Sequence, residues 1–207
     1  MVRDPAGFTL VEMMLGAAIM SVAIVALMGA FFGQAYLTAH ARNLGAAMND
    51  ATRVLELIRA QNVGTGCTLP SARPPAPYQN QSWNAWFDAN NAKSIIQPNK
   101  NLNELIVVTC QNEAGTAHCG PNQTGQDEWH PDAPISSEAM IRVTVAVGWR
   151  QQQRSVGQAS TGGAEFTYTT FGCGKVCAPP VFQVGPDQDG DGVIESQAML
   201  TTLVACR

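Results

Sequence analysis

Charged side chains are scarce in this chain of 207 residues, and cationic ones are especially few. Only 14% of the residues are Asp, Glu, Lys or Arg, and the formal net charge is −4. A protein that follows a nucleic acid along its length neutralises many phosphates with Lys and Arg. The composition therefore argues against general nucleic-acid binding.

Histidine is also rare, which restricts the catalytic chemistry that the chain can offer. The three histidines, His40, His118 and His130, do not indicate a Ser-His-Asp or Cys-His arrangement. The sequence contains no glycine-rich phosphate loop and no C-x-x-C-H haem motif. We therefore expect a protein that is not an enzyme, with an enzyme outside the cytoplasm as a remote alternative.

Cysteine is present in an even number, and its positions indicate a cellular compartment. All six cysteines follow the apolar N-terminal segment: Cys67, Cys110, Cys119, Cys173, Cys177 and Cys206. An even count outside an apolar anchor fits disulfides formed beyond the cytoplasm. The globular part is therefore expected to face an oxidising environment.

A long apolar run near the N-terminus dominates the sequence. Glu12 is the only charged residue between Phe8 and Ala39. A helix that spans a bilayer needs about 20 apolar residues, whereas the apolar part of a cleaved secretory signal has roughly 7–15. An ionised side chain deep in hydrocarbon costs roughly 2.5–3.5 kcal/mol. We therefore expect a membrane-spanning helix in which Glu12 has a positive partner.

Residues 7–12 read GFTLVE, and this stretch resembles the processing motif of prepilins, the precursors of type IV pilus and pseudopilus subunits. The resemblance implies that a dedicated peptidase cuts between Gly7 and Phe8 and methylates the new amine of Phe8. It also implies that Glu12 pairs with the N-terminal amine of a neighbouring subunit. The absence of a side chain at Gly7, which leaves room for a protease, agrees with this reading.

Two other interpretations of the apolar run are open. The run could be a plain membrane anchor with Glu12 near the lipid headgroups. It could also be a conventional signal peptide cut near Gly29 and Ala30. Neither interpretation explains why Glu12 stands five residues after a glycine.

Helical periodicity continues beyond the apolar run. Apolar residues follow in alternating four-residue and three-residue steps at Leu37, Ala41, Leu44, Met48, Ala51, Leu55 and Ile58. This spacing defines one stripe of a helix, and no proline interrupts residues 9–62. We predict a leader at residues 1–7 and one helix at 8–62, which first lies in lipid or a filament core and then packs on a sheet.

Residues 63–207 are predicted to form a β-rich head. Glycine and proline mark residues 63–77 as a connecting loop that Cys67 could pin, and Ser82 is expected to cap a short helix. Its aromatic residues Trp83, Trp86 and Phe87 are expected in the core. Strands are predicted at residues 105–110, 140–150, 164–171 and 199–205. An antiparallel sheet against the long helix gives an α+β, pilin-like fold.

The predicted strand at residues 140–150 carries a second resemblance. Its apolar residues alternate on one face: Ile141, Val143, Val145, Val147 and Trp149. The stretch 141–149 is similar to the strand ending in tryptophan of PilV-like minor pilins and of type II secretion minor pseudopilins. The resemblance implies a structural minor subunit of such a filament. The alternative is a subunit that a pilus displays as an adhesin or for DNA uptake.

The resemblance also implies where the protein acts and with what. The subunit is expected in the bacterial inner membrane with its head in the periplasm, and then in a pilus or pseudopilus at the cell envelope or surface. Its implied partners are other pilin or pseudopilin subunits, the prepilin peptidase, the inner-membrane assembly platform and membrane lipid. A separate cytoplasmic ATPase is expected to drive assembly.

An acidic stretch near the C-terminus, DQDGDGVIE at residues 187–195, is a candidate calcium site. Its oxygen ligands match five positions of an EF-hand-type loop: Asp187, Asp189, Asp191, the carbonyl of Val193, and Glu195. The twelfth position is Ala198 instead of a bidentate glutamate, so this coordination is incomplete. The alternative is an acidic surface turn.

The cysteines allow many pairings, of which two are expected here. Cys110 is predicted to pair with Cys119 as a clasp across the loop after a strand. One of Cys173 or Cys177 is predicted to pair with Cys206 and tie down the C-terminus, as disulfides do in many pilins. A zinc site is disfavoured because the spacing of Cys173 and Cys177 is not the usual two-residue knuckle.

Overall fold

The computed structural model describes residues 9–64, 67, 70–79, 81–90, 92–95, 104–112, 118–121, 129–130, 140–151, 154–156, 166–169, 181–184 and 194–207. At residues 118–121, 129–130, 154–155, 166–169 and 181–184 it describes the backbone alone. The chain divides into two compact units, Met1–Arg42 and Asn43–Arg207.

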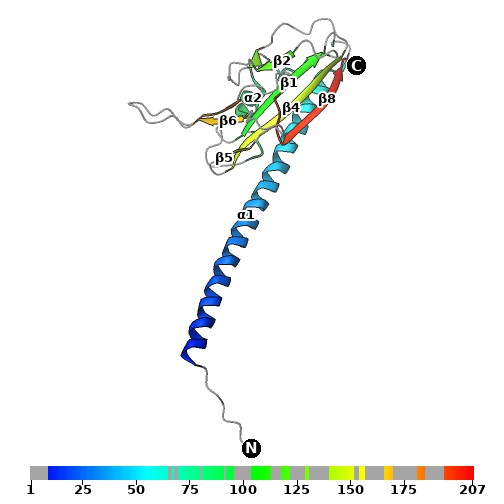
Figure 1. Cartoon of the computed structure of the whole chain (residues 1–207). Helices are drawn as coiled ribbons and strands as arrows, with labels where there is room; N and C mark the ends of the chain where they lie inside the picture. The colour runs from blue at the N-terminus through cyan, green and yellow to red at the C-terminus, as the bar shows by residue number, and fades with distance from the viewer. Residues whose placement is uncertain are drawn as a thin grey trace, which may run out of the picture. The chain divides into compact units, whose positions relative to one another are not determined.

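Helix α1 spans Leu10–Gln61 and contributes to both units (Figure 1). No proline interrupts it, and it is rich in Ala, Leu and Met, which favour helix. Its most apolar stretch of 18 residues has a mean hydropathy of 2.3. The helix is thus long and apolar enough to cross a membrane, and it confirms the helix predicted from the sequence.

The part of α1 in the second unit buries one face against the sheet. The buried positions recur in steps of three and four residues: Ala47, Asp50, Ala51, Val54, Leu55 and Ile58. The predicted stripe is confirmed at Ala51, Leu55 and Ile58, whereas Leu37 and Ala41 are exposed. These two residues belong to the first unit, which does not contain the sheet.

The main sheet pairs six described strands, all antiparallel: β1 Glu104–Asn112, β2 His118–Pro121, β3 Trp129–His130, β4 Met140–Gln151, β5 Arg154–Val156 and β8 Ala198–Ala205. Strand β1 lies between β2 and β4, and β2 pairs with β3. The other edge of β4 is shared by β8 and β5, which pair with successive parts of it (Figure 1). Strands β6 Phe166–Thr169 and β7 Val181–Val184 form a separate pair.

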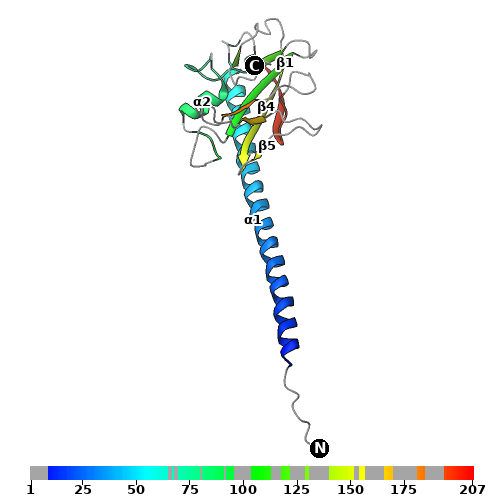
Figure 2. The same ribbon diagram turned by 60° about the vertical axis from the view of Figure 1, so that its left-hand side comes forward.

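Strand β4 contributes one complete face to the core. Its predicted alternation is confirmed, because the apolar residues of one face are all buried in the cluster that includes α1: Ile141, Val143, Val145, Val147 and Trp149. The last part of α1 runs behind β1 and β4 in both views (Figures 1 and 2). The opposite face holds a second buried cluster of Leu105, Val107, Ala146 and Ile194. The centre of the sheet is therefore covered on both faces.

Helix α2 spans Trp83–Ala89 and adds aromatic residues to the core. The hydroxyl of Ser82 accepts a hydrogen bond from the backbone nitrogen three residues later at 3.1 Å, so the predicted cap is confirmed. Trp83 and Phe87 are fully buried, and Trp86 contacts both edge-on. The Trp83 indole nitrogen donates to the carbonyl of Ala72 at 2.8 Å, which fixes the preceding loop.

All four predicted strands are present. They are longer than predicted at β1, β4 and β8, and at β6 the described residues are Phe166–Thr169. Together with the long N-terminal helix, the antiparallel sheet confirms the α+β class and is consistent with the pilin-like fold that the sequence resemblance implied.

Candidate functional site

The first turn of α1 is capped by Thr9 and Glu12. The Glu12 carboxylate accepts a hydrogen bond from the Thr9 backbone nitrogen at 2.9 Å and another from the Thr9 hydroxyl at 3.1 Å. The Glu12 backbone nitrogen donates to the same hydroxyl at 3.3 Å. This reciprocal arrangement is a capping box, and its T-x-x-E spacing is visible in the sequence. The sequence predicts a role in assembly for Glu12, and the structure adds a role as a helix cap that the prediction did not include.

Apolar side chains beyond Glu12 face outward over the whole first unit. Val22 and Val25 are each 70% exposed, and Phe32 is 75% exposed. Burying apolar surface is favourable by about 25 cal/mol per Å², and soluble monomers rarely leave such large apolar areas in water. This part of α1 therefore fits membrane anchoring or packing among other apolar helices, with one carboxylate at its start.

The predicted processing residues and most of the calcium ligands lie outside the described residues. These are Gly7 and Phe8 at the N-terminus, and Asp187, Asp189, Asp191 and Val193 near the C-terminus. Glu195 is described and is half-buried. Among the described residues, no three His, Cys, Asp or Glu side chains form a group that could hold a metal ion. Calcium binding therefore stays a prediction.

Cys206 pairs with Cys67 in a disulfide, with a Cα–Cα distance of 5.5 Å. The prediction that Cys206 pairs with Cys173 or Cys177 is therefore wrong, although the C-terminus is tied down as expected. The reason is topological. The end of α1 and the end of β8 lie together, so the cysteine that follows the helix reaches the one that follows the strand.

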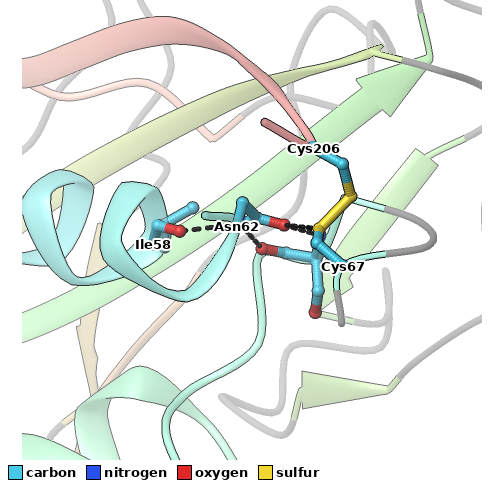
Figure 3. Close-up of a disulfide and its surroundings, with 5 residues drawn as sticks. Ile58, Asn62, Cys67 and Cys206 are labelled. Atoms are coloured by element: carbon cyan, nitrogen blue, oxygen red, sulfur yellow. Dashed lines mark hydrogen bonds between the residues drawn. A yellow bond between two sulfur atoms is a disulfide. The ribbon is translucent and has the colours of Figure 1, made fainter. Parts of the chain in front are cut away.

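The side chain of Asn62 organises the turn around this disulfide (Figure 3). Its amide nitrogen donates to the carbonyls of Ile58 at 2.6 Å and Ser71 at 2.7 Å. Its amide oxygen accepts a hydrogen bond from the Ser71 backbone nitrogen at 2.7 Å. Asn62 is buried, so these hydrogen bonds satisfy polar groups that would otherwise be costly. The turn after α1 is thus held by a covalent and a hydrogen-bonded clasp together.

The C-terminal residue joins the same clasp through the backbone. The Gly64 nitrogen donates to the carbonyl of Arg207 at 2.7 Å, and the Arg207 nitrogen donates to the carbonyl of Asn62 at 3.1 Å. Gly64 has a φ of 113°, in the left-handed region that glycine adopts most readily. The chain can therefore reverse direction after α1 and pair with its own C-terminus.

Cys110 is also disulfide-bonded. The register of β1 and β2 places the Cα of Cys119 directly opposite that of Cys110. The backbone arrangement is consistent with the predicted Cys110–Cys119 pair, while the side chain of Cys119 lies outside the described atoms. Cys173 and Cys177 also lie outside the described residues.

A pair of buried acids in the head was not anticipated from the sequence. Asp50 on α1 is 2% exposed, and Glu104 at the start of β1 is 1% exposed. A signal was present, since Asp50 lies among the apolar residues of the helical stripe and Glu104 directly precedes the apolar run of the strand. Acidic residues are almost never fully buried unless they are paired, so this cluster requires an explanation.

Comparison with known families bears on the N-terminal site alone. Residues 3–28 match the family model of the prokaryotic N-terminal methylation motif, a span that includes Glu12 and the predicted cleavage site. No curated protein and no solved structure matches the chain. Proteins that carry this motif are structural subunits and not enzymes. The chain therefore carries the N-terminal methylation motif of prokaryotic type IV pilin-like proteins, whose apolar helix fits membrane anchoring and pilus assembly.

Proposed function

We propose that this protein is a structural minor subunit of a type IV pilus or a type II secretion pseudopilus. The observation that carries the proposal is the position of Glu12. It is the single carboxylate in the exposed apolar part of α1 that belongs to the first unit, and it lies within the matched methylation motif. In this role the subunit is anchored in the bacterial inner membrane through α1, with its head in the periplasm.

Processing of the leader would create the partner that Glu12 needs. Cleavage between Gly7 and Phe8 leaves a positively charged amine on Phe8, and methylation keeps that charge. A carboxylate in an apolar surrounding is stable only when a charge or hydrogen bonds compensate it. The amine of a neighbouring subunit would supply this compensation when the apolar helices come together.

The capping box supports this mechanism because it holds the Glu12 carboxylate in position before a neighbouring subunit binds. Hydrogen bonds from Thr9 and the positive end of the helix dipole both favour a negative charge at Glu12. The carboxylate is therefore oriented at the helix start before assembly. Thr9 follows the proposed cleavage point, so the cap also persists in the mature chain.

Strand β4 of the head supports the proposal that the chain is a minor subunit. The stretch 141–149, which resembles the tryptophan-ended strand of minor pilins and pseudopilins, lies at the centre of the sheet. Trp149 is fully buried against the core that includes α1. The partners in this role are other pilin or pseudopilin subunits, the prepilin peptidase and the inner-membrane assembly platform.

Intact mass and N-terminal sequencing of the protein from its native host test the proposal. We expect a chain that begins at N-methylated Phe8. A Gly7→Val variant should keep the leader, because a branched side chain obstructs the protease. The matched control is Gly16→Val, the same substitution away from the cleavage point, which should be processed. A mature chain that keeps residues 1–7, or that starts beyond Glu12, would rule the proposal out.

Deletion of the gene separates the structural role from the alternative of a displayed adhesin or DNA-uptake subunit. Loss of all filaments, or of secretion, supports a structural or priming subunit. Normal filaments that no longer adhere or take up DNA support display. This experiment also distinguishes the two machines, since loss of filaments indicates a pilus and loss of secretion indicates a secretion pseudopilus.

A further inference from the structure

Two carboxylates from different elements meet in the core of the head, and a short segment of chain is held between them. Asp50 on α1 accepts hydrogen bonds from the backbone nitrogen of Ser94 at 2.7 Å and from its hydroxyl at 2.5 Å. Glu104 on β1 accepts one from the backbone nitrogen of Ile95 at 3.1 Å. Consecutive residues of one segment therefore contact a helix acid and a strand acid.

Among the residues that the structure describes, few cations are placed to neutralise this pair. Lys93 precedes the clamped segment, but its ammonium lies 2.8 Å from the carboxylate of Asp88 on α2. Arg53, one turn after Asp50 on α1, donates to a backbone carbonyl at 3.5 Å and stacks over Trp86 at 5.6 Å. From β4, the residue that pairs with Glu104 is the neutral Trp149. Lys93, the lysine whose charge acts on Glu104, thus already has an acidic partner.

Burial, first of all, and then the hydrogen bond and negative charge of Asp50 together raise the pKa of Glu104 to about 8. The Ile95 backbone nitrogen and the charge of Lys93 oppose this increase only in part. At neutral pH, Glu104 therefore keeps its proton, and its hydrogen bond with Asp50 contributes to the raised pKa. The Oε1 atom of Glu104 is buried and accepts no hydrogen bond in the described part of the chain. Two ionised carboxylates that bind consecutive residues would repel each other in a surrounding of low dielectric.

We propose that Asp50 and Glu104 share one proton that locks the last part of α1 onto β1, and that losing this proton at alkaline pH releases the lock. The proton joins the helix to the strand directly, and the segment at residues 94–95 joins them a second time. When the proton is lost, two negative charges face each other across the contact. The head then unfolds more easily, and it does so first where α1 meets the sheet.

The direction of the pH dependence follows from the two states of Glu104. In the unfolded chain its pKa has the ordinary value of 4.5, and in the folded head it is about 8. The folded head therefore binds one more proton than the unfolded chain between these values. The contribution of Glu104 to the stability of the head is fully present below pH 4.5, decreases as pH rises, and is lost above pH 8. Within that window, each unit of pH multiplies the unfolding equilibrium constant about tenfold.

Urea unfolding of the full chain in detergent micelles tests the proposal, followed by near-ultraviolet circular dichroism. All four tryptophans lie after residue 43, so the signal reports on the head. The Glu104→Gln variant keeps a hydrogen-bond donor toward Asp50 but cannot titrate. The ratio of the wild-type to the E104Q unfolding constant should rise roughly 300-fold between pH 5 and pH 8.

The matched control is Glu56→Gln, which removes an exposed glutamate from the same helix. Its unfolding constant should keep the pH dependence of the wild type. A change of less than about threefold in the ratio of wild type to E104Q over the same range would overturn the proposal, because a purely structural hydrogen bond gives no such slope.

Infrared difference spectroscopy provides a second measurement that does not depend on the folding of E104Q. The wild type and E56Q should both show the carbonyl band of a protonated carboxylic acid at about pH 6, and the band should disappear as pH rises through about 8. The absence of such a band from both proteins near neutral pH would show that the pair holds no proton, and it would overturn the proposal.

Discussion

The carboxylate of Glu12 lies 2.9 Å from the backbone nitrogen of Thr9 and accepts a hydrogen bond from it. The same side chain that we propose to act in assembly therefore also caps its own helix. A capping contact at a helix start contributes about 0.5–2 kcal/mol, whereas breaking a buried ion pair costs about 3–5 kcal/mol. The free energies of the capping contact and of the ion pair therefore differ, and substitutions can separate the two roles.

Replacing Glu12 by Ala should leave membrane insertion intact and impair incorporation into filaments by at least about tenfold, because the amine of the neighbouring subunit loses its partner. The measurement is the amount of subunit in sheared filaments relative to the amount in the membrane fraction. Glu12→Gln should be impaired to a similar extent, since it keeps the shape without the charge.

Thr9→Ala provides the control for this prediction. It removes the hydroxyl of the capping box and keeps the carboxylate of Glu12. Filament incorporation should stay close to that of the wild type. If T9A is as defective as E12A, the capping role accounts for the effect and the pairing mechanism fails.

The fold could be predicted from the sequence wherever the pattern of apolar residues was strong. The uninterrupted run before residue 62 predicted α1, and the alternation from Ile141 to Trp149 predicted β4. Each pattern depends only on which face of a single helix or strand is buried. It can therefore be recognised without knowing where the other elements lie. The site at Glu12 was recognisable for a similar reason, since its motif is local.

Contacts between distant segments could not be predicted in this way. The partner of Cys206 depends on where α1 ends relative to β8, and no local pattern contains that information. The pairing of Asp50 with Glu104 depends on the register of a helix against a strand. In both cases the residues were visible in the sequence, but their partners were set by the tertiary structure.

The two parts of α1 should respond differently to the same substitution. Val54 is fully buried in the head, so Val54→Ala should lower the free energy of unfolding of the head by roughly 2 kcal/mol through lost burial and an internal cavity. Val25→Ala is the matched control, because Val25 is 70% exposed. It should leave urea unfolding of the head unchanged. Equal effects of the two substitutions would contradict the assignment of core and exposed surface.

Removing the disulfide between Cys67 and Cys206 should destabilise the head strongly. The bond closes a loop with a sequence separation of 139 residues. Loss of a native disulfide lowers the free energy of unfolding by about 2–5 kcal/mol. Urea unfolding of the Cys67→Ala/Cys206→Ala variant in detergent measures this change.

Alkylation of the single variant checks the pairing itself. In Cys67→Ala, the thiol of Cys206 loses its partner, and peptide mapping should find the alkylated cysteine there. Modification of any other cysteine in place of Cys206 would mean that the disulfide has a different partner in solution.

Calcium should stabilise the head if residues 187–195 bind it as predicted. The end of that stretch is anchored to the sheet, because Ile194 is buried and the hydroxyl of Ser196 donates to the carbonyl of Val147 at 2.6 Å. Calcium binding would therefore act on β4 through these contacts. A ligand at 100 times its dissociation constant stabilises the folded state by about 2.7 kcal/mol. Thermal unfolding in calcium and in EGTA measures the effect.

Substitutions in the loop decide whether the stabilisation belongs to this site. Asp189→Asn and Asp191→Asn together remove two predicted ligand charges and should abolish the response to calcium. Asp127→Asn, an acidic residue outside the motif, should retain it. If the double variant responds to calcium as the wild type does, the ion binds elsewhere. If the wild type does not respond at all, the acidic stretch is a surface turn, as its missing twelfth ligand would allow.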